Sequence, residues 1–289
     1  EIGMLLRGIP AAEKILQRLK EEISQSPTSP GLAVVLIGND PASEVYVGMK
    51  VKKATEIGII SKAHKLPSDS TLSSVLKLIE RLNQDPSIHG ILVQLPLPKH
   101  LDSEVILQAI SPDKDVDGLH PVNMGKLLLG NFDGLLPCTP AGIIELLNYY
   151  EIPLRGRHAA IVGRSNIVGK PLAALMMQKH PQTNCTVTVL HSQSENLPEI
   201  LKTADIIIAA LGAPLFIKET MVAPHAVIVD VGTTRVPADN AKGYTLLGDV
   251  DFNNVVTKCA AITPVPGGVG PMTVAMLMSN TWRCYQNFS

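Results

Sequence analysis

A tyrosine and a lysine stand four residues apart in the segment DPASEVYVGMK, as Tyr46 and Lys50. Asp40 can cap a helix at this point and Pro41 suits its first turn, so we expect both side chains on one helical face. The spacing fits a piece of catalytic machinery, and it fits equally well two long side chains on a solvent-exposed helix. The rest of the sequence has to decide between these interpretations.

A second candidate site is the turn GRSNIVGK, which follows the apolar run HAAIV and precedes the apolar stretch PLAALMM. Gly163 permits a tight turn at the end of a strand, and Gly169 permits close packing where a helix begins. The helix start would present free backbone N–H groups to a pyrophosphate. Ser165 stands where the GxGxxG fingerprint has its middle glycine, and the last spacing is longer, so an ordinary strand-to-helix turn is the alternative.

The next apolar run, TVTVL, ends in His191 and Ser192. NAD-specific Rossmann domains usually carry Asp or Glu at this point, where it accepts hydrogen bonds from the ribose hydroxyls. Here a 2′-phosphate would meet the Ser192 hydroxyl and, from the preceding turn, the Arg164 guanidinium. The pattern favours NADP over NAD as the cofactor.

Three loops carry further candidate residues. Gln94 follows the apolar run GILV, the loop DKDVDGLHPVN concentrates acids around Asp117, and PVPGGVGPMT brings many Gly and Pro residues before the last helix. Loops at strand ends are where α/β enzymes place polar site groups, and a Gly/Pro-rich backbone can approach a ligand closely. Short-chain dehydrogenases also use Tyr-x-x-x-Lys, but after the nucleotide turn, so the order of motifs argues against that class.

Short aliphatic runs alternate with amphipathic stretches along the chain. The aliphatic runs predict strands and the amphipathic stretches predict helices, and these elements must position the candidate residues. The expected strands are 32–37, 88–95, 159–162, 186–190, 206–210 and 227–231, and the expected helices are 11–23, 41–57, 73–83, 141–149, 170–179 and 271–285. Aliphatic strands separated by helices indicate parallel sheet covered on both faces. A polar link at 151–156 suggests two α/β domains.

The composition of the 289 residues narrows the class of protein. With 45% hydrophobic and 18% charged residues, the chain can bury substantial cores. A formal net charge of -1 without a long basic run argues against a nucleic-acid or anionic-membrane surface, and no apolar stretch is long enough to span a bilayer. The cysteines lack CxxC spacing and the histidines lack an HExxH pair, so we expect buried thiols, no metal site and a cytoplasmic location.

Six motifs together resemble those of the bifunctional methylenetetrahydrofolate dehydrogenase/cyclohydrolase family, the FolD-type proteins. They are SEVYVGMK, GILVQLPLP, DKDVDGLHPVN, PCTPAGI, GRSNIVGKP and PVPGGVGPMT, and the resemblance extends from Met4 to Tyr285. It implies two α/β domains with a cleft between them, the second a Rossmann-like NADP-binding domain. The catalytic, folate-binding domain would be 4–148, completed by a C-terminal helix at 271–286, and the NADP-binding domain 149–270.

The resemblance also implies the reactions. The dehydrogenase step passes a hydride from 5,10-methylene-tetrahydrofolate to NADP, and the cyclohydrolase step adds water to the methenyl cation and opens it to 10-formyl-tetrahydrofolate. Lys50 would move protons near the reacting carbon, with a pKa lowered away from bulk water. Gln94 would hydrogen-bond and steer Lys50, Tyr46 would stack near or position the folate, and Asp117 would accept hydrogen bonds from the aminopyrimidine edge.

Two sets of binding residues follow from the same resemblance. The substrate-binding set is Tyr46, Lys50, Val93, Gln94, Leu95, Asp117, Pro266, Gly267 and Gly268. The cofactor-binding set is Gly163, Arg164, Ser165, Ser192 and Thr233. Thr233 is a departure, since many relatives carry an aliphatic residue there. The implied partners are the folate substrates and a second copy of the chain, in a homodimer formed through the nucleotide domain, without nucleic acid or membrane.

Three other functions compete with this interpretation. A monofunctional methylene-tetrahydrofolate dehydrogenase would have little cyclohydrolase activity, and the presence of Lys50, Gln94 and Asp117 speaks against it. A nucleotide-binding regulator without turnover would be expected to lose the lysine or the acid. An NADP dehydrogenase for non-folate substrates would leave the QLPLP and DVDGLHPVN loops unexplained.

Overall fold

The computed structural model describes residues 2–288, which divide into two compact units. Unit 1 contains the residues up to Ala12 together with Thr139–Thr273, and unit 2 contains Glu13–Cys138 together with the residues from Val274 onward. The division after Cys138 falls earlier than the boundary at 148–149 expected from the sequence. Each unit is an α/β structure around a parallel sheet, as the sequence predicts.

Unit 2 is built on a three-stranded parallel sheet in the order β3-β2-β4. The central strand β2 (Gly31–Ile37) pairs with β3 (Ile60–Leu66) along its whole length and with β4 (Gly90–Val93) over four residues. β2 and β4 are fully buried aliphatic runs, and the sequence predicts both. It does not predict β3, whose sequence ISKAHKL lies at the sheet edge and is mostly polar and partly exposed.

The two faces of β2 pack in different core clusters. Alternate residues of a strand point to opposite faces. Leu32, Val34 and Leu36 pack in one cluster with residues of α10, and Ala33, Val35 and Ile37 pack in a second cluster with residues of α3 and α4. The helical elements that contribute to unit 2 are α1 (Gly8–Ser24), α2 (Pro41–Glu56), α3 (Leu72–Gln84), α4 (Ser103–Ala109), η1 (Pro112–Lys114), α5 (Pro121–Leu128) and α10 (Val269–Phe288).

Unit 1 is built on a six-stranded parallel sheet in the order β1-β11-β8-β7-β5-β6. Its strands are β1 (Met4–Leu5), β5 (His158–Val162), β6 (Thr186–Leu190), β7 (Ile206–Ala209), β8 (Val227–Asp230) and β11 (Ala261–Ile262), and its helices are α6 (Cys138–Tyr149), α7 (Gly169–Met176), α8 (Leu197–Leu201), η2 (Glu219–Met221) and α9 (Phe252–Val255). The chain adds β6 on one side of β5 and then β7 on the other. The strand order therefore reverses between β5 and β7, which is where doubly wound sheets bind ligands.

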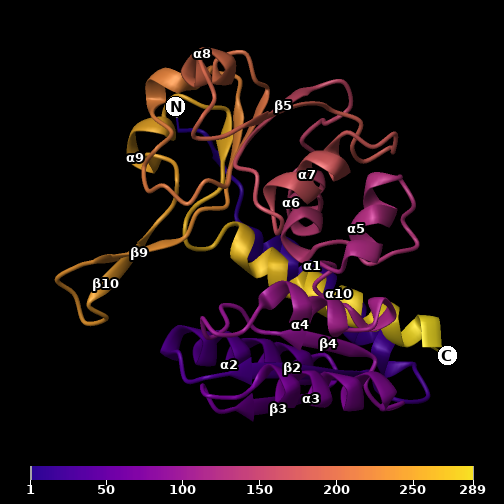
Figure 1. Cartoon of the computed structure of the whole chain (residues 1–289). Coiled ribbons are helices and arrows are strands. Elements are labelled where there is room, and N and C mark those ends of the chain that lie inside the picture. The colour runs from indigo at the N-terminus through magenta and orange to yellow at the C-terminus, as the bar shows by residue number, and fades with distance from the viewer. Residues whose placement is uncertain (1, 289) are drawn as a thin grey trace. The chain divides into compact units, whose positions relative to one another are not determined.

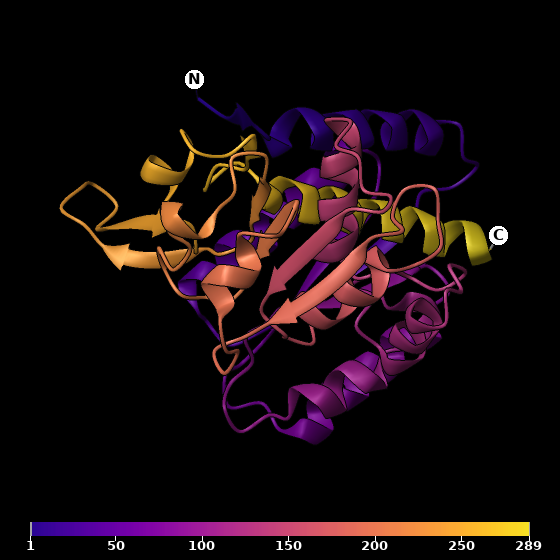
Figure 2. The same cartoon turned by 90° about the horizontal axis from the view of Figure 1, so that it is seen from above.

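A two-stranded antiparallel hairpin extends away from the six-stranded sheet of unit 1, as both views show (Figures 1 and 2). It consists of β9 (Thr234–Pro237) and β10 (Tyr244–Leu247). The Arg235 guanidinium lies 4.3 Å from the centre of the Tyr244 ring, so a cation–π contact joins the two strands. None of the helices in residues 2–288 combines the length and the hydropathy that a membrane span requires.

Candidate active site

The Lys50 side chain of unit 2 is held by an amide. Asp40 caps α2 by accepting a hydrogen bond from the Ser43 N–H (3.0 Å), and the helix presents Lys50 toward the end of β4. There the Lys50 Nζ donates a hydrogen bond of 2.8 Å to Oε1 of Gln94. The Gln94 Nε2 donates to the Leu95 carbonyl (3.0 Å), which fixes the amide with its oxygen toward the lysine. The predicted contact between Gln94 and Lys50 is confirmed.

The other expected folate contacts of unit 2 differ in accessibility. Tyr46, one helical turn before Lys50 on α2, is 38% exposed and free to meet a ligand ring. Leu95 is half-buried beside Gln94. Val93 is buried, and its side chain belongs to the core cluster of α3 and α4. A contact of Val93 with substrate would therefore involve its backbone.

Lys50 and Asp117 have mutually dependent protonation. Burial lowers the pKa of Lys50, while the charges of Asp117 and Cys138 raise it in part. The pKa of Asp117 is raised to about 7: burial raises it most, the charge of Lys50 lowers it, and the charge of Asp115 raises it. Both groups therefore titrate closer to neutrality than they would in water. Groups whose pKa values are shifted in this way are suited to proton transfer.

Asp117 sits on a loop that is folded around a buried carboxylate. Asp115 accepts hydrogen bonds from the backbone N–H groups of Leu119 (3.3 Å) and His120 (2.9 Å) and from Nδ2 of Asn123 (2.8 Å). Burial nevertheless raises the pKa of Asp115. These bonds fix the backbone of the loop that carries Asp117, and the bridge between Ile91 and Asp115 joins this loop to β4.

Two residues that support this loop were not identified from the sequence. Asn280, on α10, donates through Nδ2 to the carbonyls of Val116 (2.8 Å) and Leu136 (2.9 Å), and the Cys138 thiol donates to the same Val116 carbonyl (3.3 Å). Val116 directly precedes Asp117. The PCTPAGI motif marks the position of Cys138, but no local signal marks Asn280, because its partners are far away in the sequence.

In unit 1, the glycine-containing turn lies at the reversal of strand order. Gly163 follows β5 with a φ of +131°, and a Cβ placed on it would lie 2.1 Å from the carbonyl oxygen of Ala210, which follows β7. A Cβ on Gly169, the first residue of α7, would lie 2.3 Å from the Gly163 carbonyl oxygen. Both positions therefore require glycine. Contrary to the expectation from the sequence, the N–H groups of Gly169 and Lys170 at the start of α7 are already bonded to Ser165.

Ser165 occupies the middle position of this turn, and its side chain bonds to the backbone that leads into α7. Its Oγ accepts hydrogen bonds from the N–H groups of Val168 (3.1 Å) and Gly169 (3.4 Å). Arg164 is exposed in the turn, Ser192 is exposed just after β6, and Thr233 is exposed just before β9. The side chains expected to contact a cofactor are thus accessible from solvent.

In the Gly/Pro-rich loop after β11, backbone atoms lie close to Gly267 and Gly268. Gly267 has a φ of +96°, and its carbonyl accepts a hydrogen bond from the Gly8 N–H (2.8 Å). A Cβ on Gly268 would lie 2.5 Å from the Pro264 carbonyl oxygen, while Pro266 is exposed. The loop can therefore offer a ligand its backbone and the Pro266 ring.

No metal centre accompanies these groups in the described chain. Among residues 2–288, no group of three or more His, Cys, Asp and Glu side chains is arranged to hold a metal ion. All four cysteines are buried and without a disulfide.

The fold and the two groups of residues define a two-unit α/β protein of the dinucleotide-binding class. The chain belongs to the tetrahydrofolate dehydrogenase/cyclohydrolase family. The family's catalytic-domain model matches residues 6–117, and its NAD(P)-binding-domain model matches residues 137–289. The resemblance inferred from the six motifs is confirmed.

Known relatives align with nearly the whole chain. It is 78% identical over 286 residues to the "Bifunctional protein FolD" of Chlamydia abortus, which covers 99% of this chain and 100% of the relative. The FolD methylenetetrahydrofolate dehydrogenase/cyclohydrolase of Campylobacter jejuni is 44% identical with a TM-score of 0.92, over 98% of this chain and 99% of that one. The Trypanosoma brucei enzyme, solved with NADP cofactor and an inhibitor, is 34% identical with a TM-score of 0.93, over 99% and 98%.

Proposed function

We propose that this chain is a bifunctional one-carbon folate enzyme. It oxidises 5,10-methylene-tetrahydrofolate to the 5,10-methenyl compound with NADP and hydrolyses that product to 10-formyl-tetrahydrofolate. Family membership and the bifunctional relatives support both activities. The observation that carries the hydrolytic half is the 2.8 Å bond from Lys50 to Gln94 beside Asp117, whose pKa is raised to about 7.

The turn of unit 1 fits NADP by its backbone and by its charge. Gly163 and Gly169 keep side-chain atoms out of the close packing between β5 and α7, and the turn between them would lie against the pyrophosphate. Arg164 and Ser192 would hold the 2′-phosphate, and Thr233 would contact the nicotinamide end. When bound, NADP accepts the hydride from the methylene carbon.

Lys50 is the group that would carry protons during hydrolysis. In its neutral form, favoured by the lowered pKa, it takes a proton from the water whose oxygen bonds to the methenyl carbon. The bond from that carbon to N5 of the folate then breaks, and the remaining hydroxyl proton passes to N5. The net reaction consumes one water and releases one proton. Gln94 keeps the lysine nitrogen in place throughout.

Asp117 and Tyr46 would bind the folate ring. The pterin's aminopyrimidine edge offers N–H donors, which a carboxylate accepts at Asp117, and the exposed Tyr46 ring offers a face for stacking. Val93, Leu95, Pro266, Gly267 and Gly268 complete the proposed substrate-binding set. We keep 4–148 with 271–286 as the proposed folate-binding domain and 149–270 as the NADP-binding domain.

The family resemblance also supports a homodimer formed through the nucleotide domain and a cytoplasmic location. Sedimentation velocity over a range of protein concentrations tests the first proposal. A dimer that persists at micromolar concentration supports it, and a monomer at all concentrations contradicts it.

The proposed function is tested by mixing the purified protein with 5,10-methylene-tetrahydrofolate and either NADP or NAD. Reduced nicotinamide, the methenyl compound and the 10-formyl product are followed separately. We expect reduction with NADP and conversion to 10-formyl-tetrahydrofolate faster than the uncatalysed rate. Accumulation of the methenyl compound would indicate a monofunctional dehydrogenase, and absence of reduction with either cofactor would contradict the proposal.

A further inference from the structure

Unit 1 contains a pair of buried carboxylates that the proposed mechanism does not use. Asp230 is the last residue of β8 and is 4% exposed, and Asp249 follows β10 and is 1% exposed. The pKa of Asp230 is raised to about 6: burial raises it most, backbone hydrogen bonds from Asp249 and Val250 lower it, and the charge of Asp249 raises it. Burying a charged carboxylate costs free energy unless hydrogen bonds stabilise the charge. The hydrogen-bond partners of Asp230 and Asp249 therefore indicate their structural role.

Asp230 receives hydrogen bonds from two segments of backbone. Its Oδ1 accepts from the N–H groups of Gly232 (3.0 Å) and Asp249 (2.9 Å), and its Oδ2 accepts from the N–H of Val250 (3.1 Å). The first of these bonds folds the turn that leads to Thr233, one of the proposed cofactor contacts. The other two attach that turn to the segment after β10.

Asp249 reaches a different loop. Its Oδ2 accepts hydrogen bonds from the N–H groups of Leu211 (2.7 Å) and Gly212 (3.0 Å), just after β7. In the part of the chain that the structure describes, its buried Oδ1 has no hydrogen-bond partner. A Cβ on Gly232 would lie 2.3 Å from that oxygen. One carboxylate therefore bonds to the loop after β7 with one oxygen and touches the turn after β8 with the other.

The loop after β7 is also the one that contacts the glycine-containing turn. Ala210 precedes Leu211, and its carbonyl oxygen is the atom that excludes a side chain at Gly163. Asp249 thus fixes the backbone against which the Gly163 turn is packed. Through Asp230 the same segment fixes Gly232, next to Thr233.

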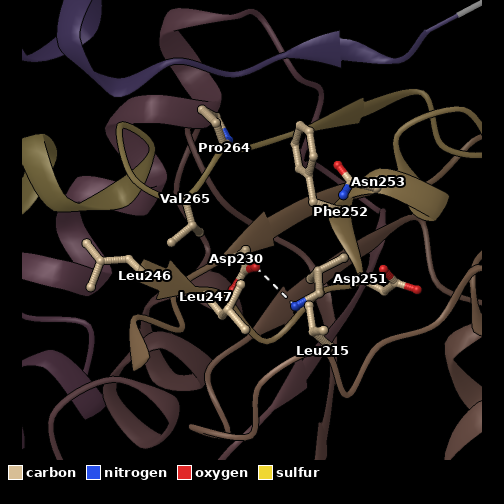
Figure 3. Close-up of a pocket in the computed structure, with 11 residues that line it drawn as sticks. Leu215, Asp230, Leu246, Leu247, Asp251, Phe252, Asn253, Pro264 and Val265 are labelled. Atoms are coloured by element: carbon tan, nitrogen blue, oxygen red, sulfur yellow. Dashed lines mark hydrogen bonds between the residues drawn. The ribbon is translucent and has the colours of Figure 1, made fainter. Parts of the chain in front are cut away.

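This end of the sheet also borders a cavity. A cavity of about 270 Å³ is lined by Asp230, by Leu246 and Leu247 of β10, and by Pro264 and Val265, which precede Pro266 (Figure 3). Asp230 therefore stands where an opening meets the carboxyl ends of the strands, the edge at which doubly wound sheets bind ligands.

We propose that Asp249 is a positioning residue for NADP, which it serves by holding the loops after β7 and β8 in their cofactor-binding arrangement, with Asp230 as its link to the second loop. The inference rests on the proposed function, because it takes NADP as the cofactor. Asp249 is removed from solvent and acts through the backbone of Leu211, Gly212 and Gly232.

The test uses the full chain with Asp249→Ala, Asp249→Asn and, as a matched control, Asp239→Ala in the exposed hairpin of the same unit. Titration calorimetry measures the Kd for NADP, and hydrolysis of methenyl-tetrahydrofolate without NADP reports on the rest of the chain. Because two charge-assisted hydrogen bonds are lost, Asp249→Ala should raise the Kd about tenfold or more. The NADP-free hydrolysis should stay near the wild-type rate.

Asp249→Asn retains an amide oxygen that can accept from Leu211 and Gly212, so it should recover most of the NADP affinity. Two results would overturn the inference: Asp249→Ala binding NADP as well as Asp239→Ala, or hydrolysis falling in parallel with NADP affinity. Absence of hydrolysis in the wild type would contradict the proposed function instead. The Kd comparison would in that case still decide the role of Asp249.

Discussion

The two units place their ionisable groups in opposite ways. In unit 2, Lys50 and Asp117, the groups expected to do chemistry, are half-buried, and their partial removal from solvent shifts the pKa values of both. In unit 1, the expected ligand contacts Arg164 and Ser192 are exposed, while the buried acids bond to backbone. Proton transfer benefits from a shifted pKa, whereas binding a charged phosphate benefits from a fixed backbone and an accessible cation.

Replacing Lys50 should have the largest effect, and this effect should be confined to unit 2. Lys50→Met should lower the rate of methenyl-tetrahydrofolate hydrolysis by about 10²- to 10⁴-fold, the range usual for loss of a general acid–base group. The Kd for NADP should remain near the wild-type value, as titration calorimetry would show. Lys52→Met, an exposed neighbour on the same helix, is the matched control. A normal hydrolysis rate, or lost NADP binding, would contradict the assignment.

The complementary change is made in the turn of unit 1. Gly163→Ala places a methyl group 2.1 Å from the Ala210 carbonyl oxygen, at a φ that L-residues avoid. NADP binding should fall at least about tenfold, since the backbone must move at the pyrophosphate site. Gly156→Ala is the control, because its φ is also positive but its Cβ would meet nothing within 4 Å. Equal NADP affinities for the two variants would remove this turn from the cofactor site.

A surface cation should give a smaller and more selective effect. Arg164→Ala should weaken NADP binding about tenfold, the loss expected for one charge-assisted contact to a 2′-phosphate, and leave the Kd for NAD nearly unchanged. Fluorescence titration with both dinucleotides measures the ratio. Equal losses for NADP and NAD would place Arg164 away from the 2′-phosphate.

The agreement between the elements expected from the sequence and those in the structure also differs between regions. Buried aliphatic strands such as β2 and β5, and capped helices such as α2, are found close to their expected bounds, because local pattern and burial agree there. The edge strand β3 could not be expected from ISKAHKL, because its pairing with β2 rather than its own composition makes it a strand. β4 spans Gly90–Val93 and not 88–95, and the prolines at 96 and 98, which have no N–H to donate, cannot continue its pairing.

The residues that support the two sites could not be predicted from the sequence. The family resemblance suggested the Lys50–Gln94 contact, and the structure contains it. Asn280 and Asp249 act on loops far from them along the chain, through bonds to backbone groups. Backbone acceptors and donors leave no side-chain pattern, so only the folded structure reveals these partners.

The last expected effect concerns the dependence of stability on pH. Asp117 has a pKa of about 7 in the folded chain, against an ordinary value of 3.8. Between those values the folded state binds the proton more tightly than the unfolded state does, so the free energy of unfolding falls as pH rises from 3.8 to about 7. Asp117→Asn should flatten this slope and be the more stable protein above pH 7. Denaturant unfolding at several pH values measures it, and parallel curves for both proteins would contradict it.

The central claim, that burial prepares Lys50 for proton transfer, is tested most directly by its own titration. Lysine labelled with ¹³C at Cε can be followed by NMR across alkaline pH, and Lys50→Met assigns the resonance. We predict that Lys50 titrates at lower pH than the exposed lysines, and at lower pH still in Asp117→Asn, because the Asp117 charge raises its pKa. A Lys50 resonance that titrates together with the exposed lysines would contradict the account.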